Sequence, residues 1–243
     1  MAGLITHLVV AREIIKLLPE GIIADEGLFY LGSIVPDAIH AREGYIRADK
    51  KHTHLRDNIP DKNFGLQVNL SIFYRRVSDF ILEHRDRKDG LLDLYCGYVV
   101  HLLTDELYLL TIRAEFCEIM KQLGVVQDDM RFYNNIVTDM HRNDFLLVQK
   151  SEEISEIRNQ LEQVRIYEIL GYLSDQEIRQ SRDWLINRHF VETHEIQEPV
   201  YISYERNLEF TKMAAENITE RLLGKEDLPR MLSNVYDKQT KWI

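Results

Sequence analysis

Apolar side chains recur every three or four residues along most of the chain, and strict alternation of apolar and polar residues is rare. The first spacing is typical of amphipathic helices, and alternation is typical of strands. The sequence therefore predicts an all-α protein. Helices are expected over residues 7–18, 25–34, 66–84, 128–150, 151–164, 174–190 and 204–223, with Thr6 as the N-cap of the first.

A further predicted helix, residues 91–112, is apolar on nearly every face. A helix of this kind is buried on all sides, so we expect a multi-helix bundle built around it. Residues 45–64 are polar, lack periodicity and are predicted to form a long loop. We expect one helical domain over residues 1–243, with residues 151–243 as an extension of the same domain.

The net charge of the chain and the length of its apolar runs indicate which classes of binding partner to expect. The 243 residues include 30 Lys and Arg against 40 Asp and Glu, which gives a formal net charge of −10. An acidic protein lacks the positive field that attracts nucleic acid, so we do not favour nucleic acid as a partner. No apolar run reaches the roughly 18 residues that a membrane span needs, so stable membrane insertion is not expected.

The amino-terminal residues and the cysteines give information on the cellular location of the protein. Residues 1–18 lack the basic start and uninterrupted apolar stretch of a signal peptide. Cys96 and Cys117 lie in apolar helical segments and are predicted to be buried free thiols. These features favour a cytoplasmic location.

The clearest candidate for chemistry is His101 with Asp105 in the central helix. A spacing of four residues places both side chains on one helical face, close enough to share a metal ion. Aspartate is rarely buried without a partner, yet this one lies in the most apolar helix of the chain. Gly97, one turn earlier on that face, leaves room for a ligand or for another backbone. The alternative is a His–Asp pair that only bonds internally.

Three other early positions offer similar ligands. His52 and His54 lie two residues apart in the predicted loop, where either imidazole can turn inward toward a metal. Asp37 ends the turn GSIVPD and is either a metal-site residue or a turn residue. His7 faces the interior side of the first helix, where an ordinary core histidine is the competing interpretation.

A later pair, His141 and Asp144, lies three residues apart on the 128–150 helix. The predicted buried stripe of that helix contains Met130, Tyr133 and Asp144. His141 and Asp144 are therefore expected to be each other's partners or to bind metal. Asp139 is predicted to face solvent. The remaining histidines stand beside charged residues and are predicted to lie on the surface: His40, His84, His189 and His194.

The donor set points to a hydrolytic metal site. No nucleophile elbow, phosphate loop, zinc knuckle or dinucleotide fingerprint occurs. Histidine and aspartate donors without nearby cysteine fit zinc, or manganese, iron or nickel.

The order TH, GSIVPD, HTH and GYVVHLLTD resembles the zinc-dependent phospholipase C family, whose relatives include the single-strand-specific fungal nucleases. The resemblance covers roughly the first 110 residues and, loosely, His141. It implies an all-helical fold of the phospholipase C and nuclease type, a zinc site of His and Asp ligands, and hydrolysis of phosphoesters. The residues that match the family pattern are His7, Asp37, His52 or His54, His101 and Asp105.

The resemblance also bears on the size of the metal cluster. The family places a histidine six residues after the ligand Asp, where this chain has Thr111. His141 and Asp144 are expected to take the place of the family's last ligands. We therefore expect one or two zinc ions, or another divalent transition metal, in place of a full trinuclear cluster.

These observations predict a metal-dependent phosphoesterase that acts on a small phosphodiester or phosphomonoester. Metal lowers the pKa of water to about 7, and Asp37 is expected to act as the general base or as a ligand. One alternative is a nucleotide phosphohydrolase of the helical His/Asp type, although the adjacent His-Asp dipeptide of that superfamily is absent. Another is a non-catalytic helical module whose His–Asp pairs are structural.

Overall fold

The structure is a computed structural model that describes residues 2–190, 194–225 and 228–232. Within these ranges no β-strand is present, and extended pairing is limited to an isolated bridge between Ile169 and Leu173. The prediction of an all-α protein is confirmed. The helices are α1 (Leu4–Leu17), α2 (Glu26–Ile34), η1 (Val35–Ala41), α3 (Arg47–Thr53), η2 (Asp61–Asn63), α4 (Gln67–His84), α5 (Leu92–Leu110), α6 (Ile112–Gln122), α7 (Met130–Lys150), α8 (Ile154–Gln163), α9 (Asp175–His189) and α10 (Tyr204–Leu222); η1 and η2 are 3-10 helices.

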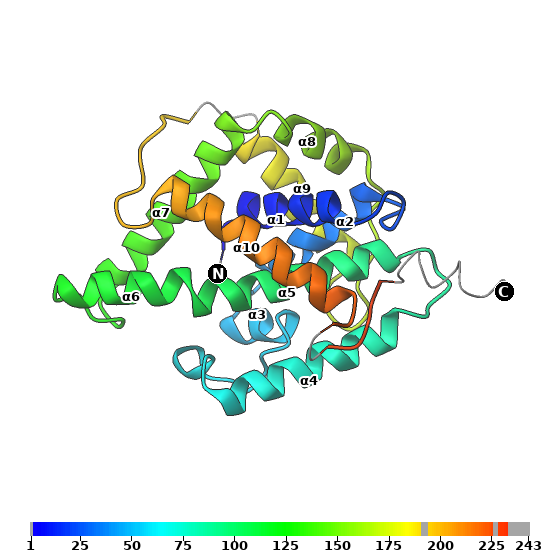
Figure 1. Cartoon of the computed structure of the whole chain (residues 1–243), viewed down its shortest axis with the longest axis horizontal. Helices are drawn as coiled ribbons and strands as arrows, with labels where there is room; N and C mark the ends of the chain where they lie inside the picture. The colour runs from blue at the N-terminus through cyan, green and yellow to red at the C-terminus, as the bar shows by residue number, and fades with distance from the viewer. Residues whose placement is uncertain (1, 191–193, 226–227, 233–243) are drawn as a thin grey trace.

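Helix α5 lies at the centre of the bundle. Every residue from Asp93 to Tyr108 is buried, because the helix is apolar on nearly all faces and has neighbours on each. Helices α1, α2, α4 and α10 all contact it, and Figure 1 shows α10 crossing α5, with α4 below them in this view. The prediction of a buried central helix is confirmed.

Helices α2 and α5 touch through their backbones. A Cβ atom on Gly97 would overlap the carbonyl oxygen of Phe29, and one on Gly32 would overlap that of Leu94. Of the two uses predicted for the space at Gly97, the structure shows the approach of another backbone. This close contact brings the carbonyl group of Ser33 within 2.8 Å of the Nδ1 atom of His101.

The segment 45–64 is not the long loop that we predicted. It contains α3 and η2. The residues of α3 that are buried are Lys50 and Thr53, both polar, so hydrophobic periodicity could not reveal this helix. The Asp49 side chain accepts a hydrogen bond from the backbone N–H of Ile46 at 2.9 Å and supports the first turn of α3.

The buried face of α7 also differs from the predicted stripe. Met130 and Tyr133, expected on that stripe, are exposed. Asp139, expected in solvent, is buried and accepts hydrogen bonds from the backbone N–H groups of residues 200–202 at 2.6–3.0 Å. Burial of a carboxylate is tolerated because these three donors satisfy it.

Helices from residues 151–243 pack directly on the first half of the chain. Helix α10 packs on α1, α8 on α2, and α9 on η1. An ion pair of 2.6 Å between Arg42 and Glu177 joins the end of η1 to the first turn of α9. Glu177 also accepts from the backbone N–H of Ser174, whose hydroxyl caps α9. These contacts hold α9 against the turn that carries Asp37.

The structure corrects the predicted burial of three side chains: His84, His189 and Cys117. His84 and His189 are buried, although their charged neighbours in sequence suggested the surface. The neighbours lie on other helical faces. Cys96 is a buried free thiol as predicted, whereas Cys117 is only partly buried.

In the part of the chain that the structure describes, no helix has the length and apolarity needed to cross a bilayer.

Candidate metal centre

Helices α1 and α5 bring three ligand-type side chains together in the interior. His101 and Asp105 lie one turn apart on α5, as their spacing predicts, and His7 faces them from α1. The Nε2 atom of His7 lies 3.4 Å from Oδ1 of Asp105. Ligand atoms of the three residues all lie within 4.8 Å of one another, and all three side chains are buried.

A second group of three shares His101 with the first. It adds Asp37 from η1 and His54, which follows α3 directly. The Nε2 atom of His54 lies 3.3 Å from Oδ1 of Asp37 and 3.2 Å from Nε2 of His101. The same nitrogen is 3.6 Å from Oδ2 of Asp105, so the two groups form one continuous set. We call His7, Asp37, His54, His101 and Asp105 the His–Asp cluster.

The hydrogen bonds around His101 determine which of its nitrogens carries hydrogen. The Nδ1 atom lies 2.8 Å from the carbonyl oxygen of Ser33, which can only accept. Nδ1 therefore carries the hydrogen in the neutral ring, and Nε2 keeps a lone pair directed into the cluster.

The same reasoning applies to His54. The hydroxyl of Thr53 donates its single hydrogen to the carbonyl group of Pro36 at 2.9 Å or of Lys50 at 3.2 Å. Its oxygen is then an acceptor for Nδ1–H of His54 at 3.1 Å. In this arrangement Nε2 of His54 also carries a lone pair. Two imidazole lone pairs facing each other at 3.2 Å repel unless a cation lies between or beside them.

Burial and neighbouring charge keep four cluster residues unprotonated at neutral pH: Asp37, His54, His101 and Asp105. Burial lowers the pKa of His54 and lowers that of His101 well below its ordinary value. Burial alone would raise the pKa of Asp37, but the ammonium group of Lys50 holds it well below its usual range. The pKa of Asp105 is also held well below its usual range against the effect of burial, with His7 and His101 contributing. Deprotonated donors are the form that binds metal.

Several cluster atoms have no hydrogen-bond partner despite complete burial. They are both ring nitrogens of His7 and Oδ2 of Asp105. Buried polar atoms are nearly always satisfied in folded proteins, so such atoms require an explanation. A metal ion within the cluster would supply the missing partner for one ring nitrogen of His7 and for Oδ2 of Asp105, and the residues present fit that group.

Lys50 lies beside the cluster and is itself buried. Its ammonium group contacts Oδ1 of Asp37 and lies 3.2 Å from Nε2 of His40. A buried ammonium needs such partners, and its charge offsets part of the negative charge of the cluster. No spacing rule in the sequence singled out Lys50, because the segment was interpreted as a loop.

The structure distinguishes between His52 and His54. His52 is exposed, with Nδ1 3.0 Å from a carboxylate oxygen of Asp57 and Nε2 3.2 Å from the carbonyl oxygen of Gly171. It does not join the cluster, whereas His54 does. A helical segment turns these two side chains to different sides, which a flexible loop need not have done.

The expected pairing of His141 with Asp144 is corrected by the structure. His141 is exposed, and Asp144 is buried with other partners. Its carboxylate accepts from the backbone N–H of Ile5 at 3.2 Å, from that of Thr6 at 3.1 Å, and from the Thr6 hydroxyl at 3.0 Å. Neither residue belongs to the groups of clustered ligand atoms found among the described residues.

Asp144 instead caps the amino-terminal end of α1. The first backbone N–H groups of a helix have no internal partner, and a carboxylate there satisfies them. Helix α1 consequently begins at Leu4, and Thr6 lies inside its first turn instead of serving as the N-cap. A Cβ on Gly3 would overlap the Asp144 carboxylate, so this approach requires glycine. Burial raises the pKa of Asp144 to about 6.

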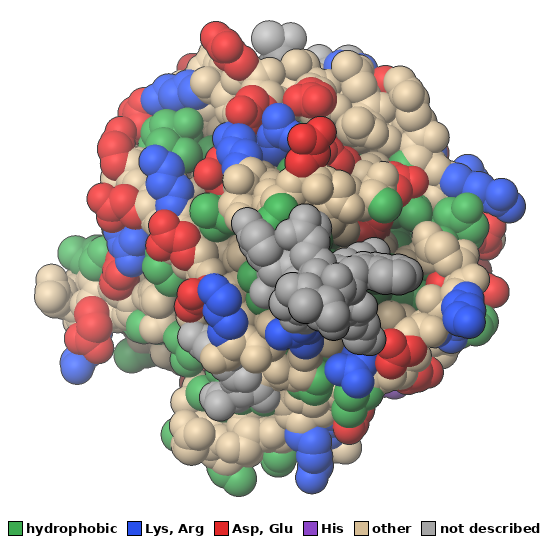
Figure 2. All heavy atoms as spheres, turned by 45° about the vertical axis from the view of Figure 1, so that its right-hand side comes forward, with side chains coloured by type: hydrophobic (Ala, Val, Ile, Leu, Met, Phe, Trp, Pro, Cys, Tyr) green, Lys and Arg blue, Asp and Glu red, His purple; other side chains and the backbone are tan. Residues whose placement is uncertain are grey.

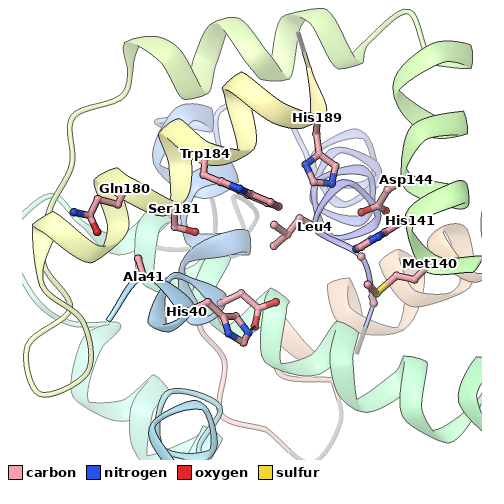
Figure 3. Close-up of a pocket in the computed structure, with 13 residues that line it drawn as sticks. Leu4, His40, Ala41, Met140, His141, Asp144, Gln180, Ser181, Trp184 and His189 are labelled. Atoms are coloured by element: carbon pink, nitrogen blue, oxygen red, sulfur yellow. Dashed lines mark ion pairs between the residues drawn. The ribbon is translucent and has the colours of Figure 1, made fainter. Parts of the chain in front are cut away.

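A cavity of about 470 Å³ opens beside the cluster. Asp37 and Asp144 line it, and α9 forms one wall with Trp184 and His189. Trp184 and His189 point into the cavity from α9 and His141 faces them from α7 (Figure 3). Sequence reasoning missed this wall, because no motif spacing relates α9 to the cluster.

Comparison of the chain with protein-family models, curated proteins and solved structures found no significant match.

Proposed function

We propose that this protein is a metal-dependent phosphoric ester hydrolase, with zinc held by the His–Asp cluster and a fold related to that of the zinc-dependent phospholipases C. One observation carries the proposal. The Nε2 atoms of His54 and His101 lie 3.2 Å apart, and the hydrogen bonds of both rings leave lone pairs on these atoms. A structural His–Asp pair would place a hydrogen between such nitrogens, while a metal site requires both lone pairs.

His101 belongs to both groups of clustered ligand atoms, and this limits the number of metal ions that the cluster can hold. One imidazole nitrogen binds one ion, so an ion bound by His101 draws its other ligands from His7, Asp105, His54 and Asp37. A second ion would have to use the donors that remain. This supports a site for one or two ions.

When bound, zinc would supply Lewis acidity, lowering the pKa of a water molecule to about 7 and polarising a phosphoryl oxygen. The other roles belong to side chains. Asp37 lines the cavity, and its Oδ1 atom contacts the ammonium group of Lys50. We assign Oδ2 of Asp37 to accept a proton from the attacking water or to bind metal. Lys50 holds the Asp37 carboxylate in place and keeps it ionised.

Surface charge favours a small substrate over a nucleic acid. The formal net charge is −10, and on the face shown in Figure 2 acidic and basic side chains are interspersed without an extended basic patch. A nucleic-acid interface would gather Lys and Arg on one face. The cavity beside the cluster has the volume of a small-molecule site.

The test combines elemental analysis with an activity panel. Purified full-length protein should contain about one or two zinc ions per chain and should hydrolyse p-nitrophenyl phosphate or bis(p-nitrophenyl) phosphate. His54→Ala should lose both metal and activity. The matched control is His52→Ala, two residues away and exposed, which should keep both.

A folded protein that takes up no transition metal, even after reconstitution with zinc, would refute the metal site and support a structural module. Stoichiometric zinc without hydrolysis of either ester class would retain the metal site and refute the esterase assignment.

A further inference from the structure

The cavity beside the His–Asp cluster has walls of two kinds. At its inner end is Asp37, a member of the cluster. The remainder is formed by residues of the amino-terminal segment, η1, α7 and α9, of which Leu4, Met140 and Trp184 are the large apolar ones. The metal ligands therefore come from residues 7–105, while most of the cavity wall comes from residues 140–189.

No Lys or Arg lines this cavity within the described ranges. Its ionisable lining consists of two aspartates, Asp37 and Asp144, and of histidines. A second phosphate group or a carboxylate on the substrate would find no cationic partner there, and it would lie near these two carboxyl groups. The chemistry of the wall is therefore unfavourable for a polyphosphate and favours an uncharged group.

Two side chains of α9 indicate the shape and polarity of the uncharged group that the cavity would bind. The indole of Trp184 reaches into the cavity although 49% of the residue is exposed, so it offers an aromatic face without being part of the core. His189 is 4% exposed and lines the cavity, and its Nδ1 atom has no hydrogen-bond partner. A buried nitrogen without a partner at a cavity wall is a position at which a ligand atom can bond.

We propose that this cavity binds the organic group of the phosphoester and that this group is an uncharged aromatic ring system, stacked on Trp184. This rests on the proposed function, since it places the phosphoryl group at the His–Asp cluster. The cavity volume of about 470 Å³ accommodates one or two fused rings. His189 Nδ1 provides a hydrogen bond to a polar atom on the ring.

The position of α9 makes this wall rigid. Arg42, at the end of η1, pairs with Glu177 of α9 at 2.6 Å and donates to the carbonyl group of Tyr172 at 2.9 Å. Asp37 belongs to η1, so the same contacts fix the distance between the cluster and the aromatic wall. A pre-formed site of this kind binds without reordering the chain.

The experiment uses three probes on the full-length protein: 2-naphthylmethylphosphonate, methylphosphonate and 2-naphthol. Calorimetric titration of zinc-loaded protein should show the naphthyl phosphonate binding at least tenfold more tightly than methylphosphonate. Trp184→Ala should remove about tenfold of the naphthyl affinity and leave that of methylphosphonate unchanged. Trp184→Phe, which keeps an aromatic face, should retain most of it. Tyr133→Ala on α7, an exposed aromatic that does not line the cavity, is the matched control and should change neither.

2-Naphthol, which has no phosphoryl group, separates this proposal from the proposed function. It should bind to metal-free protein and lose affinity in Trp184→Ala. Equal affinity for the two phosphonates, or a naphthyl preference that survives Trp184→Ala, would overturn the aromatic site while leaving the phosphoryl site standing. Binding of 2-naphthol with no binding of either phosphonate would overturn the phosphoester assignment and support the aromatic site alone.

Discussion

The imidazole rings of His7 and His101 stack face to face, with ring centroids 3.9 Å apart and planes 7° from parallel. The two residues come from α1 and α5 and are separated by 94 positions in the sequence. Two positively charged rings at this separation would repel each other, and His7 accordingly contributes to the lowered pKa of His101. The stack thus favours a neutral His101 ring, and one nitrogen of each ring lies within 4.8 Å of an Asp105 oxygen.

The first prediction concerns His101 and Asp105 as ligands of one ion. His101→Ala and Asp105→Ala should each reduce metal content severely, and the double variant should lose little more than either single one. This non-additivity is expected because the two residues serve one site. Inductively coupled plasma mass spectrometry of the folded variants measures it, with the exposed His52→Ala as the control.

A purely structural pair predicts a different outcome. Removal of His101 would then leave a buried carboxylate with one partner fewer and lower the free energy of unfolding by roughly 3–5 kcal/mol. Metal content would not change. Full metal occupancy in folded His101→Ala protein would contradict our assignment.

The second prediction concerns removal of the metal. A ligand that binds only the folded state stabilises it by about 2.7 kcal/mol at 100 times its dissociation constant. For a chain of this length, a chelator should therefore lower the melting temperature by about 5–10 °C, and added zinc should restore it. Differential scanning calorimetry measures the shift. In His54→Ala the chelator should have little effect, and a full shift in that variant would point to metal bound elsewhere.

The third prediction concerns the backbone contact between α2 and α5. A methyl group in Gly97→Ala would overlap the carbonyl oxygen of Phe29, so the helices must separate. We expect a loss of at least about 3 kcal/mol in the free energy of unfolding, as for severe overpacking in a core. Urea denaturation measures it. Gly65→Ala is the control, because its methyl group would meet only a flexible Leu110 side chain at 3.3 Å. Equal stability of the two variants would show that the helices can separate without loss.

The fourth prediction concerns pH. Burial, with smaller contributions from His141, His194 and Arg188, lowers the pKa of His189 from 6.5 to about 4. Because the folded-state pKa lies below the unfolded value, the stability associated with neutral His189 is present above pH 6.5 and is lost as the pH falls toward 4. The loss amounts to roughly 3 kcal/mol for this residue. His189→Gln cannot titrate, so the stability difference between this variant and the original chain should shrink or reverse between pH 7 and pH 4. A difference that stays constant with pH would contradict the prediction.

The central part of the fold was predictable because its signals are local. Residues 91–112 are apolar all round, and this alone indicates a buried helix. The spacing of His101 and Asp105 on that helix determines that they share a face. Two helices of the second half were also well placed, since Ser174 caps α9 and Gly224 ends α10 with a positive φ of 71°.

What could not be predicted depends on contacts between distant segments. Asp139 and Asp144 looked like one solvated and one paired carboxylate, but backbone N–H groups of residues 200–202 and 5–6 bind them. His189 was placed on the surface because its neighbours are charged, yet helical geometry turns it into the cavity. Hydrophobic periodicity carries no information on such polar partners.

The capping of α1 by Asp144 has a consequence for the order of folding. The donors at Ile5 and Thr6 precede their acceptor by 138 to 139 positions in the sequence. A contact of such sequence separation forms late, because a long loop must close before it is gained. Until this contact forms, α1 lacks its cap, and the position of His7 relative to α5 is not fixed. His7 is therefore aligned with the rest of the His–Asp cluster only after Asp144 has emerged from the ribosome, and a metal ion bound by this cluster would meet its complete ligand set only from that point on.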